Sequence, residues 1–277
     1  MKIVSSGKVL NSSKLYKKKK RKKIIFIVLL VLGISALLYS FVYFSREERF
    51  IISGVSVLGE NIVDRSDMET AVRESITGYY LWVLPKSNLF LYPRRTIEHA
   101  LVEKFPRLSS ASIDLSEKTL YVSVEERLPY ALYCGDTNTS ASDGKCYFLD
   151  NEGLIFALAP SFSGNSYFVY ATEEPIEDPL GKRLVEVEEF KELINFIENL
   201  ELLNIKSRAL EVGTDSYSLV MSGGGEIIWR KNNPLTLIQE NLAAFLANDS
   251  IKTQKDFLDK VLYLNLSNEN KVFYKFK

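Results

Sequence analysis

Few residues of this 277-residue sequence carry the side chains that enzymes use for catalysis. His99 is the only histidine, and no Asp, Cys or second His adjoins it, so we expect a structural or solvent-facing role. Ser5 and Lys8 match the S-x-x-K pattern of penicillin-binding enzymes, but the companion motifs are missing from the sequence. Glu125 and Glu126 are neighbours on an expected strand, where successive side chains point to opposite faces, so they should not form an acid/base pair.

A phosphate or metal site is also poorly supported. The sequence contains no close metal-ligand spacing, no G-x-S-x-G motif and no P-loop. Gly223, Gly224 and Gly225 offer backbone N–H groups that could cradle a phosphate. They stand between two β-like runs rather than before a helix, so a hairpin turn is expected instead. The sequence therefore predicts a non-enzymatic protein with no catalytic residue, no metal ligand and no cofactor.

The two cysteines favour a covalent link rather than redox chemistry. Cys134 and Cys146 bracket a Gly/Asp/Ser-rich turn between two apolar runs. In an oxidising compartment we expect a disulfide that staples this hairpin and contributes roughly 2–4 kcal/mol. The alternative is a pair of unbonded, small hydrophobic residues.

Charge is distributed unevenly along the chain. Lys plus Arg and Asp plus Glu each number 35, but residues 1–23 hold ten basic residues and no acidic one. Without those ten, 25 basic residues face 35 acidic ones, a net charge of −10, which argues against nucleic-acid binding by the folded part. The Lys-rich and Ser-rich tail is expected to be disordered on its own.

One segment is suited to crossing a membrane. Residues 24–44 are uncharged, and these 21 residues would span the ~30 Å hydrocarbon core as a helix. A cleaved signal peptide is the alternative, but its apolar region is only ~7–15 residues long and ends in small residues. Here the segment ends in aromatic residues, and residues 17–23 are basic. The positive-inside rule then places residues 1–23 in the cytoplasm and the remainder outside it.

Residues 45–128 are expected to form a small α+β domain. Residues 50–60 predict a strand, because Val55 and Val57 alternate to one face. Two further alternating strands should meet at a polar turn formed by residues 116–119. Two helices lie between these strands in the sequence. The order β-α-α-β-β predicts one sheet that is covered on one face by both helices.

Start and stop signals bound these two helices. Ser66 and Glu69 form an S-x-x-E capping box that should open the first helix, which ends near Gly78. The second helix should begin after Pro93 and stop by Pro106. The apolar residues expected on the buried faces are Met68, Ala71, Val72 and Ile76 in the first helix and Ile97, Leu101 and Phe105 in the second.

Residues 129–277 are expected to be rich in strands and to include two helices. An amphipathic helix is predicted at residues 186–203, and a second one after Pro234. Strands are predicted at residues 130–134, 146–150, 154–158, 166–170, 217–221, 226–229, 261–266 and 271–276.

Several local patterns resemble those of the bacterial cell-division protein FtsQ, called DivIB in Gram-positive species. The segment FIISGVSVLGEN is similar to that family's first strand after the membrane helix, and VLYLNLSNENKVFYKF is similar to its last two strands. The family's Glu-Arg-x-Pro-x-Ala and Asp-x-x-Gly-x-hydrophobic patterns correspond to Glu126, Arg127, Pro129 and Ala131, and to Asp150, Gly153 and Phe156. The order of these patterns behind one basic-flanked apolar segment makes the resemblance fairly specific.

The resemblance implies a POTRA domain at residues 45–128 and the family's β domain at residues 129–277. It also implies a non-enzymatic divisome scaffold in the cytoplasmic (inner) membrane at the division septum. Residues 1–23 would be a cytoplasmic tail and residues 24–44 a single span. The partners would be FtsB/DivIC-like and FtsL-like coiled-coil proteins together with other divisome components.

In that family the partner pairs with the C-terminal edge strand of the β domain. By position, the contact residues here would be Val272, Phe273, Tyr274 and Lys275, with Tyr263 and Leu264 on the neighbouring strand. An edge strand suits this role because its unpaired backbone groups and alternate side chains can both bind an added strand. The family often has Asp and Arg in the preceding strand, where this chain has Asn265 and Ser267.

Two other interpretations remain open on the residues alone. One is an unrelated single-span scaffold that carries a POTRA-like domain, with the same fold but a different partner. The other is a membrane-anchored cell-wall enzyme that acts on peptidoglycan, with acidic residues that converge only in three dimensions. An exposed C-terminal strand would favour a scaffold, and a cleft with clustered carboxylates would favour an enzyme.

Overall fold

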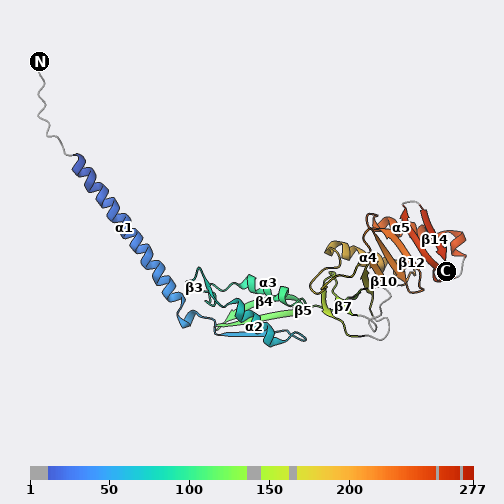
Figure 1. Cartoon of the computed structure of the whole chain (residues 1–277), viewed down its shortest axis with the longest axis horizontal. Helices are drawn as coiled ribbons and strands as arrows, with labels where there is room; N and C mark the ends of the chain where they lie inside the picture. Colours follow the sequence, from blue (N-terminus) through green and yellow to red (C-terminus); the bar gives the residue numbers. More distant parts are fainter. Residues whose placement is uncertain (1–11, 136–144, 162–166, 254–255, 269–270) are drawn as a thin grey trace, which may run out of the picture. The chain divides into compact units, whose positions relative to one another are not determined.

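The computed structural model describes residues 12–135, 145–161, 167–253, 256–268 and 271–277 (Figure 1). It is a mixed α+β structure with one N-terminal apolar helix and a large β-rich region. The chain divides into two compact units. The first comprises Met1–Leu58, Arg65–Ile97 and Ser112–Ser123, and the second comprises Gly59–Asp64, Glu98–Ala111 and Val124–Lys277.

The N-terminal helix α1 (Ser12–Ser45) contains the apolar segment. Its part Lys17–Ser45 is long and apolar enough to span a membrane, and none of its apolar 18-residue window is buried inside the protein. The expected disorder of the tail is wrong for residues 12–23, which continue the helix. Lys and Arg are good helix formers, and a helix that the apolar residues have nucleated extends at little cost. Ser5 and Lys8 lie outside the described residues.

A three-stranded sheet with two helices follows, and the β2–β3 hairpin, which the sequence did not predict, lies between the two helices in the chain. The sheet order is β1-β5-β4, and β1 runs parallel to β5, with Val57 opposite Val122. Val55 and Val57 are both buried, as their alternation predicts. The elements are η1 (Glu48–Phe50), β1 (Gly54–Leu58), α2 (Arg65–Ser75), β2 (Tyr79–Tyr80), β3 (Leu84–Pro85), α3 (Arg94–Lys104), β4 (Leu108–Ser116) and β5 (Thr119–Glu126).

The apolar faces of both helices are confirmed, but one helix start is wrong. The residues predicted to be buried in α2 and α3 are buried, except that Phe105 is half-buried. Helix α2 begins at Arg65, so Ser66 lies inside its first turn rather than before it. The backbone carbonyl of Ser66 accepts a hydrogen bond from Thr70 Oγ1 at 2.7 Å, as an interior helix position does.

The second unit contains a nine-stranded sheet in the order β14-β13-β12-β11-β10-β9-β6-β7-β8. The pairs β6–β9, β9–β10 and β12–β13 are parallel, and the other neighbours are antiparallel. The strands are β6 (Ala131–Cys134), β7 (Cys146–Leu149), β8 (Ile155–Leu158), β9 (Val169–Thr172), β10 (Ser207–Val212), β11 (Ser216–Met221), β12 (Glu226–Arg230), β13 (Val261–Asn268) and β14 (Lys271–Phe276).

Helices α4 (Val187–Leu202) and α5 (Leu235–Ala247) confirm the two predicted helices. They belong to one hydrophobic cluster with the sheet, in which the Trp229 ring lies 5.0 Å from Phe196 and 5.4 Å from Tyr217. Two one-turn helices, α6 (Asp249–Lys252) and α7 (Phe257–Lys260), were not predicted. Their apolar residues Ile251 and Phe257 join the same cluster.

The opposite face of strands β6 and β7 carries a smaller cluster and the two cysteines. Tyr133 belongs to the large cluster, whereas its neighbours Leu132 and Cys134 belong to the small one, as the alternation of a strand requires. Cys134 and Cys146 stand opposite each other in the β6–β7 ladder and form a disulfide, with their Cα atoms 4.4 Å apart. The residues between them that lie at 136–144 are outside the described part of the chain.

An ion pair joins the Glu-Arg-x-Pro-x-Ala motif to the Asp-x-x-Gly motif. The Arg127 guanidinium bonds Asp150 Oδ2, and both side chains are almost fully buried. Asp150 Oδ1 accepts the backbone N–H groups of Glu152 and Leu154, both at 2.9 Å, and so shapes the turn between β7 and β8. The Arg127 Nε atom also donates to the Pro106 carbonyl at 3.1 Å. These two motifs therefore form one hydrogen-bonded structure.

Candidate partner-binding edge of the nine-stranded sheet

Strand β14 is an edge strand. Among the described residues it has one neighbouring strand, β13, and it ends the strand order of the sheet (Figure 1, red). In an antiparallel pair, alternate residues direct their N–H and C=O groups to the neighbour, and the residues between them direct theirs away. Half of the backbone groups of β14 therefore face outward along the strand. Such a row can accept an added strand.

The side chains of β14 separate into two faces. Tyr274 stands opposite Leu264 in the ladder, and Leu264 is fully buried, so Val272, Tyr274 and Phe276 lie on the side of the helices. Phe273 stands opposite Asn265 and lies on the other side with Lys275. Both faces carry exposed aromatic surface. Phe273 is 49% exposed, and Tyr274 and Phe276 are each 42% exposed.

An aromatic cluster joins the helix side of β14 to α5 and α7. The Tyr274 ring lies 5.6 Å from Phe245 of α5 and 5.6 Å from Phe257 of α7. The Phe276 ring lies 5.5 Å from Tyr274 and 5.6 Å from Phe257. Phe257 is buried and Phe245 half-buried, so the cluster has a fixed base under two exposed rings. Rings at these separations attract one another beyond their burial.

Lys277 fixes the end of β14. Its backbone N–H donates to the Lys260 carbonyl at 3.0 Å, and its Nζ atom donates to the carbonyls of Gly223 and Asp259. The glycines at 223–225 form the turn between β11 and β12, closed by Met221 N–H to the Gly225 carbonyl at 2.7 Å, which confirms the predicted hairpin turn. These bonds from Lys277 add to the β13–β14 pairing and hold the C-terminal end of the edge strand in place.

The six contact residues predicted from the sequence differ in how exposed their side chains are. Val272, Phe273, Tyr274 and Lys275 are all on the edge strand, where Val272 is half-buried and the other three are exposed. Tyr263 is half-buried on β13. Leu264 is fully buried in the core, so its side chain is not available for contact with a partner.

Three aromatic residues beside the edge were not predicted as site residues, namely Phe245, Phe257 and Phe276. Phe276 follows Tyr274 at the two-residue period of a strand, which places both on one face and could have identified it. Phe257 lies in the one-turn helix α7, which is too short to show a periodic signal. Asn265 and Ser267 are bonded to each other, with the Ser267 N–H donating to Asn265 Oδ1 at 2.9 Å.

The other chemical candidates are dispersed. His99 is exposed on α3, and Glu125 is exposed whereas the Glu126 carboxylate is buried on the opposite side of β5. Across the described residues, no group of three or more His, Cys, Asp or Glu side chains is placed to hold a metal ion. In the described part of the chain, the surface best suited to binding a partner is the β14 edge with its aromatic cluster. No protein-family model matches this chain, and no curated protein matches it either.

Proposed function

We propose that this protein is a non-enzymatic, membrane-anchored scaffold of the FtsQ/DivIB type. In this proposal α1 is the single span, residues 1–23 face the cytoplasm, and the remainder acts outside the cytoplasmic membrane at the division septum. The observation that carries the proposal is the exposed edge strand β14 beside the aromatic rings of Tyr274 and Phe276. The resemblance in sequence supplies the identity of the partners.

The partner would bind by adding a strand to β14. An extended segment of an FtsB/DivIC-like protein would pair with the outward backbone groups of the edge, which supplies affinity independent of sequence. A helix of the same partner, or of the FtsL-like protein bound to it, would place apolar side chains on Tyr274, Phe276 and Phe245. Large aromatic residues that are partly buried at their base are typical energetic centres of interfaces.

Titration of the full-length protein in lipid nanodiscs with FtsB/DivIC-like and FtsL-like proteins tests this proposal. Tyr274→Ala should weaken binding by about tenfold, because truncating an aromatic contact at an interface typically costs ~1–2 kcal/mol. The matched control is Leu202→Ala, since Leu202 is an 80% exposed apolar residue at the end of α4. This control should bind like the unchanged protein.

Two adjacent proline variants test strand addition itself. Phe273 and Tyr274 are consecutive, so one of them directs its N–H to β13 and the other directs it outward. Of Phe273→Pro and Tyr274→Pro, the one that removes the outward donor should weaken partner binding while circular dichroism is unchanged. Binding that survives deletion of residues 268–277 would refute the edge as the site. Absence of binding by the folded, unchanged protein would refute the divisome partners.

A further inference from the structure

The tip of the β2–β3 hairpin exposes two large apolar side chains. Leu81 is 88% and Trp82 is 92% exposed, so neither gains burial within the described part of the chain. Both residues have a left-handed backbone, with φ of 46° and 66°. The Val83 N–H closes the turn by donating to the Tyr80 carbonyl at 3.1 Å. Gly and Asn are the usual residues at such positions, so Leu and Trp there are unfavourable for the isolated fold.

Arg46 holds this tip beside the end of α1. Helix α1 ends at Ser45, and Arg46 is the first charged residue after the apolar stretch. Its Nε and Nη2 atoms donate to the Val83 carbonyl at 3.1 and 3.0 Å. The first charge after a membrane span lies where hydrocarbon meets the lipid headgroups. The hairpin tip is therefore held within one side-chain length of that boundary.

The residues around the tip have the composition of a membrane interface. The Arg46 guanidinium lies 5.7 Å from the centre of the Tyr79 ring, and Lys86 Nζ lies 5.8 Å from the Tyr80 ring. Trp and Tyr are enriched at the headgroup level of membranes, and long basic side chains near it direct their charge toward water. The hairpin combines both residue types around an apolar tip.

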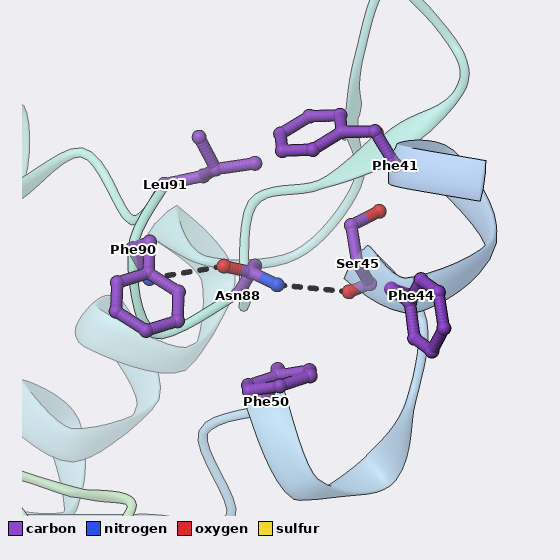
Figure 2. Close-up of a pocket in the computed structure, with 7 residues that line it drawn as sticks. All are labelled: Phe41, Phe44, Ser45, Phe50, Asn88, Phe90 and Leu91. Carbon is purple, nitrogen blue, oxygen red and sulfur yellow. Dashed lines mark hydrogen bonds between the residues drawn. The ribbon is translucent and has the colours of Figure 1, made fainter. Parts of the chain in front are cut away.

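An apolar pocket opens beside the same end of α1. The pocket has a volume of about 260 Å³, and its apolar lining comes from Phe41 and Phe44 of α1 and from Phe50, Phe90 and Leu91. Figure 2 shows the ring of Phe41 directed toward Leu91. At the base of the pocket, the buried side chain of Asn88 donates to the Ser45 carbonyl at 2.8 Å and accepts the Phe90 N–H at 2.9 Å (Figure 2). The polar atoms of Asn88 are therefore paired inside the protein, and the wall of the pocket is almost entirely carbon.

We propose that the β2–β3 hairpin tip, with the pocket lined by Phe90, is a second membrane-contacting surface. Leu81 and Trp82 enter the bilayer at the interface beside α1, and lipid acyl chain covers the pocket. The occupant is lipid because Phe41 and Phe44 belong both to the pocket and to the apolar part of α1, so the two surfaces are continuous. The first unit would thereby be held against the membrane by the hairpin as well as by α1.

This inference requires α1 to cross a bilayer, as the proposed function also does, but it requires no division partner. The test is the fluorescence of the full-length protein in nanodiscs made with plain or brominated phospholipid. The chain has two tryptophans, Trp82 and Trp229, and Trp229 is fully buried in the core of the sheet. A Trp82→Phe variant therefore emits from Trp229 alone. Subtracting that emission from the unchanged protein's gives the emission of Trp82.

The expected result is a Trp82 emission that is shifted to shorter wavelength and largely lost in brominated lipid, while Trp229 emission is unchanged. A Leu202→Trp substitution in the Trp82→Phe background is the control, because Leu202 is similarly exposed but belongs to the second unit. Equal quenching at position 202 would overturn the proposal, since it would indicate unspecific adsorption.

Unquenched, water-exposed Trp82 emission from protein that co-elutes with the discs would also overturn it, and would assign the tip to a protein partner instead. That outcome leaves partner binding through β14 untouched. Failure of the protein to co-elute with the discs would overturn the span, and with it both proposals. Loss of partner binding with normal Trp82 quenching would overturn the proposed function alone.

Discussion

At the scale of single residues, Glu126 shows how the side chain of a short motif can stabilise the fold. Its carboxylate is almost fully buried and accepts an N–H bond from Arg107 at 3.1 Å. Burial opposes its ionisation, but the hydrogen bonds outweigh burial and hold the pKa of Glu126 at about 2. The backbone N–H groups that donate to it belong to Ile62, Asn61 and Val63.

Glu126→Gln should therefore change the acid sensitivity of the protein. Because the folded pKa lies below the ordinary value of 4.5, the charge of Glu126 stabilises the fold fully above about pH 4.5. That contribution is lost as the pH falls toward 2. The Gln variant should lose roughly 1–3 kcal/mol at neutral pH, since a neutral acceptor replaces a charged one. Thermal unfolding in detergent at several pH values measures both effects.

The quantity to follow is the difference in unfolding temperature between the unchanged protein and the Glu126→Gln variant at each pH. The gap in unfolding temperature should narrow progressively between pH 4.5 and pH 2, because the unchanged protein loses its extra stabilisation there. A gap that stays constant over this range would contradict the assigned role of the charge. Glu125→Gln is the matched control, since Glu125 is exposed on the opposite face of β5.

At the scale of elements, the turn between β7 and β8 positions the start of α4. Gly153 has a left-handed backbone with φ of 75°, and its carbonyl accepts the Leu184 N–H at 2.9 Å. A Cβ atom built at Gly153 would lie 2.9 Å from Cγ of Phe190, which is fully buried on α4. The glycine is therefore required both for the turn and for the approach of the helix.

Gly153→Ala should destabilise the protein by roughly 2–4 kcal/mol, as backbone strain and overpacking add. Gly78→Ala separates the two causes, because Gly78 also has a left-handed backbone, with φ of 96°, but nothing lies within 4 Å of its Cβ position. Gly78→Ala should lower the free energy of unfolding by about 1–2 kcal/mol, through backbone strain alone. Unfolding temperatures of the two variants test this order, and equal losses would refute the contact with Phe190.

Strong periodic signals allowed most elements to be predicted from the sequence. Helices α2, α3, α4 and α5 show apolar stripes at helical spacing, and the residues predicted to be buried in the first two helices are buried except for the half-buried Phe105. The β4–β5 turn is confirmed although it lacks glycine, with φ of 45° and 67° at Glu117 and Lys118. The two-residue period of a strand also places Val272 and Tyr274 on one face of β14, and Phe273 and Lys275 on the other.

The elements that were missed are short or lie where local signals conflict. Strands β2 and β3 have two residues each, and the left-handed Leu81 and Trp82 between them are residue types that do not predict a turn. Strand β10 (Ser207–Val212) includes charged residues, and its register with β11 shifts after Ser207, which masks the alternation. Strand β9 lies at Val169–Thr172, displaced from the predicted residues 166–170. Such positions depend on tertiary contacts.

At the scale of the whole molecule, the charges and the disulfide allow the proposed orientation in the membrane to be tested. Residues 17–23 supply seven positive charges directly before the apolar segment, whereas Arg46 and Arg49 are balanced by Glu47 and Glu48. The positive-inside rule counts basic residues within ~15–20 positions of a span. The Cys134–Cys146 disulfide adds a reporter, because such bonds persist outside the cytoplasm and are reduced within it.

Replacing the basic residues at 17–23 by Gln should therefore produce a population of inverted chains. Arg46 and Arg49 would then be the nearest basic residues to the span, so orientation with the second unit in the cytoplasm becomes competitive. Lys2→Gln is the control, because Lys2 lies 22 positions before residue 24 and therefore outside the range that the positive-inside rule counts. Protease added to spheroplasts should digest the second unit of the control fully and that of the replaced chain only in part. Thiol labelling should find Cys134 and Cys146 reduced in the protected fraction alone, and an unchanged digestion pattern would show that the basic run does not orient the chain.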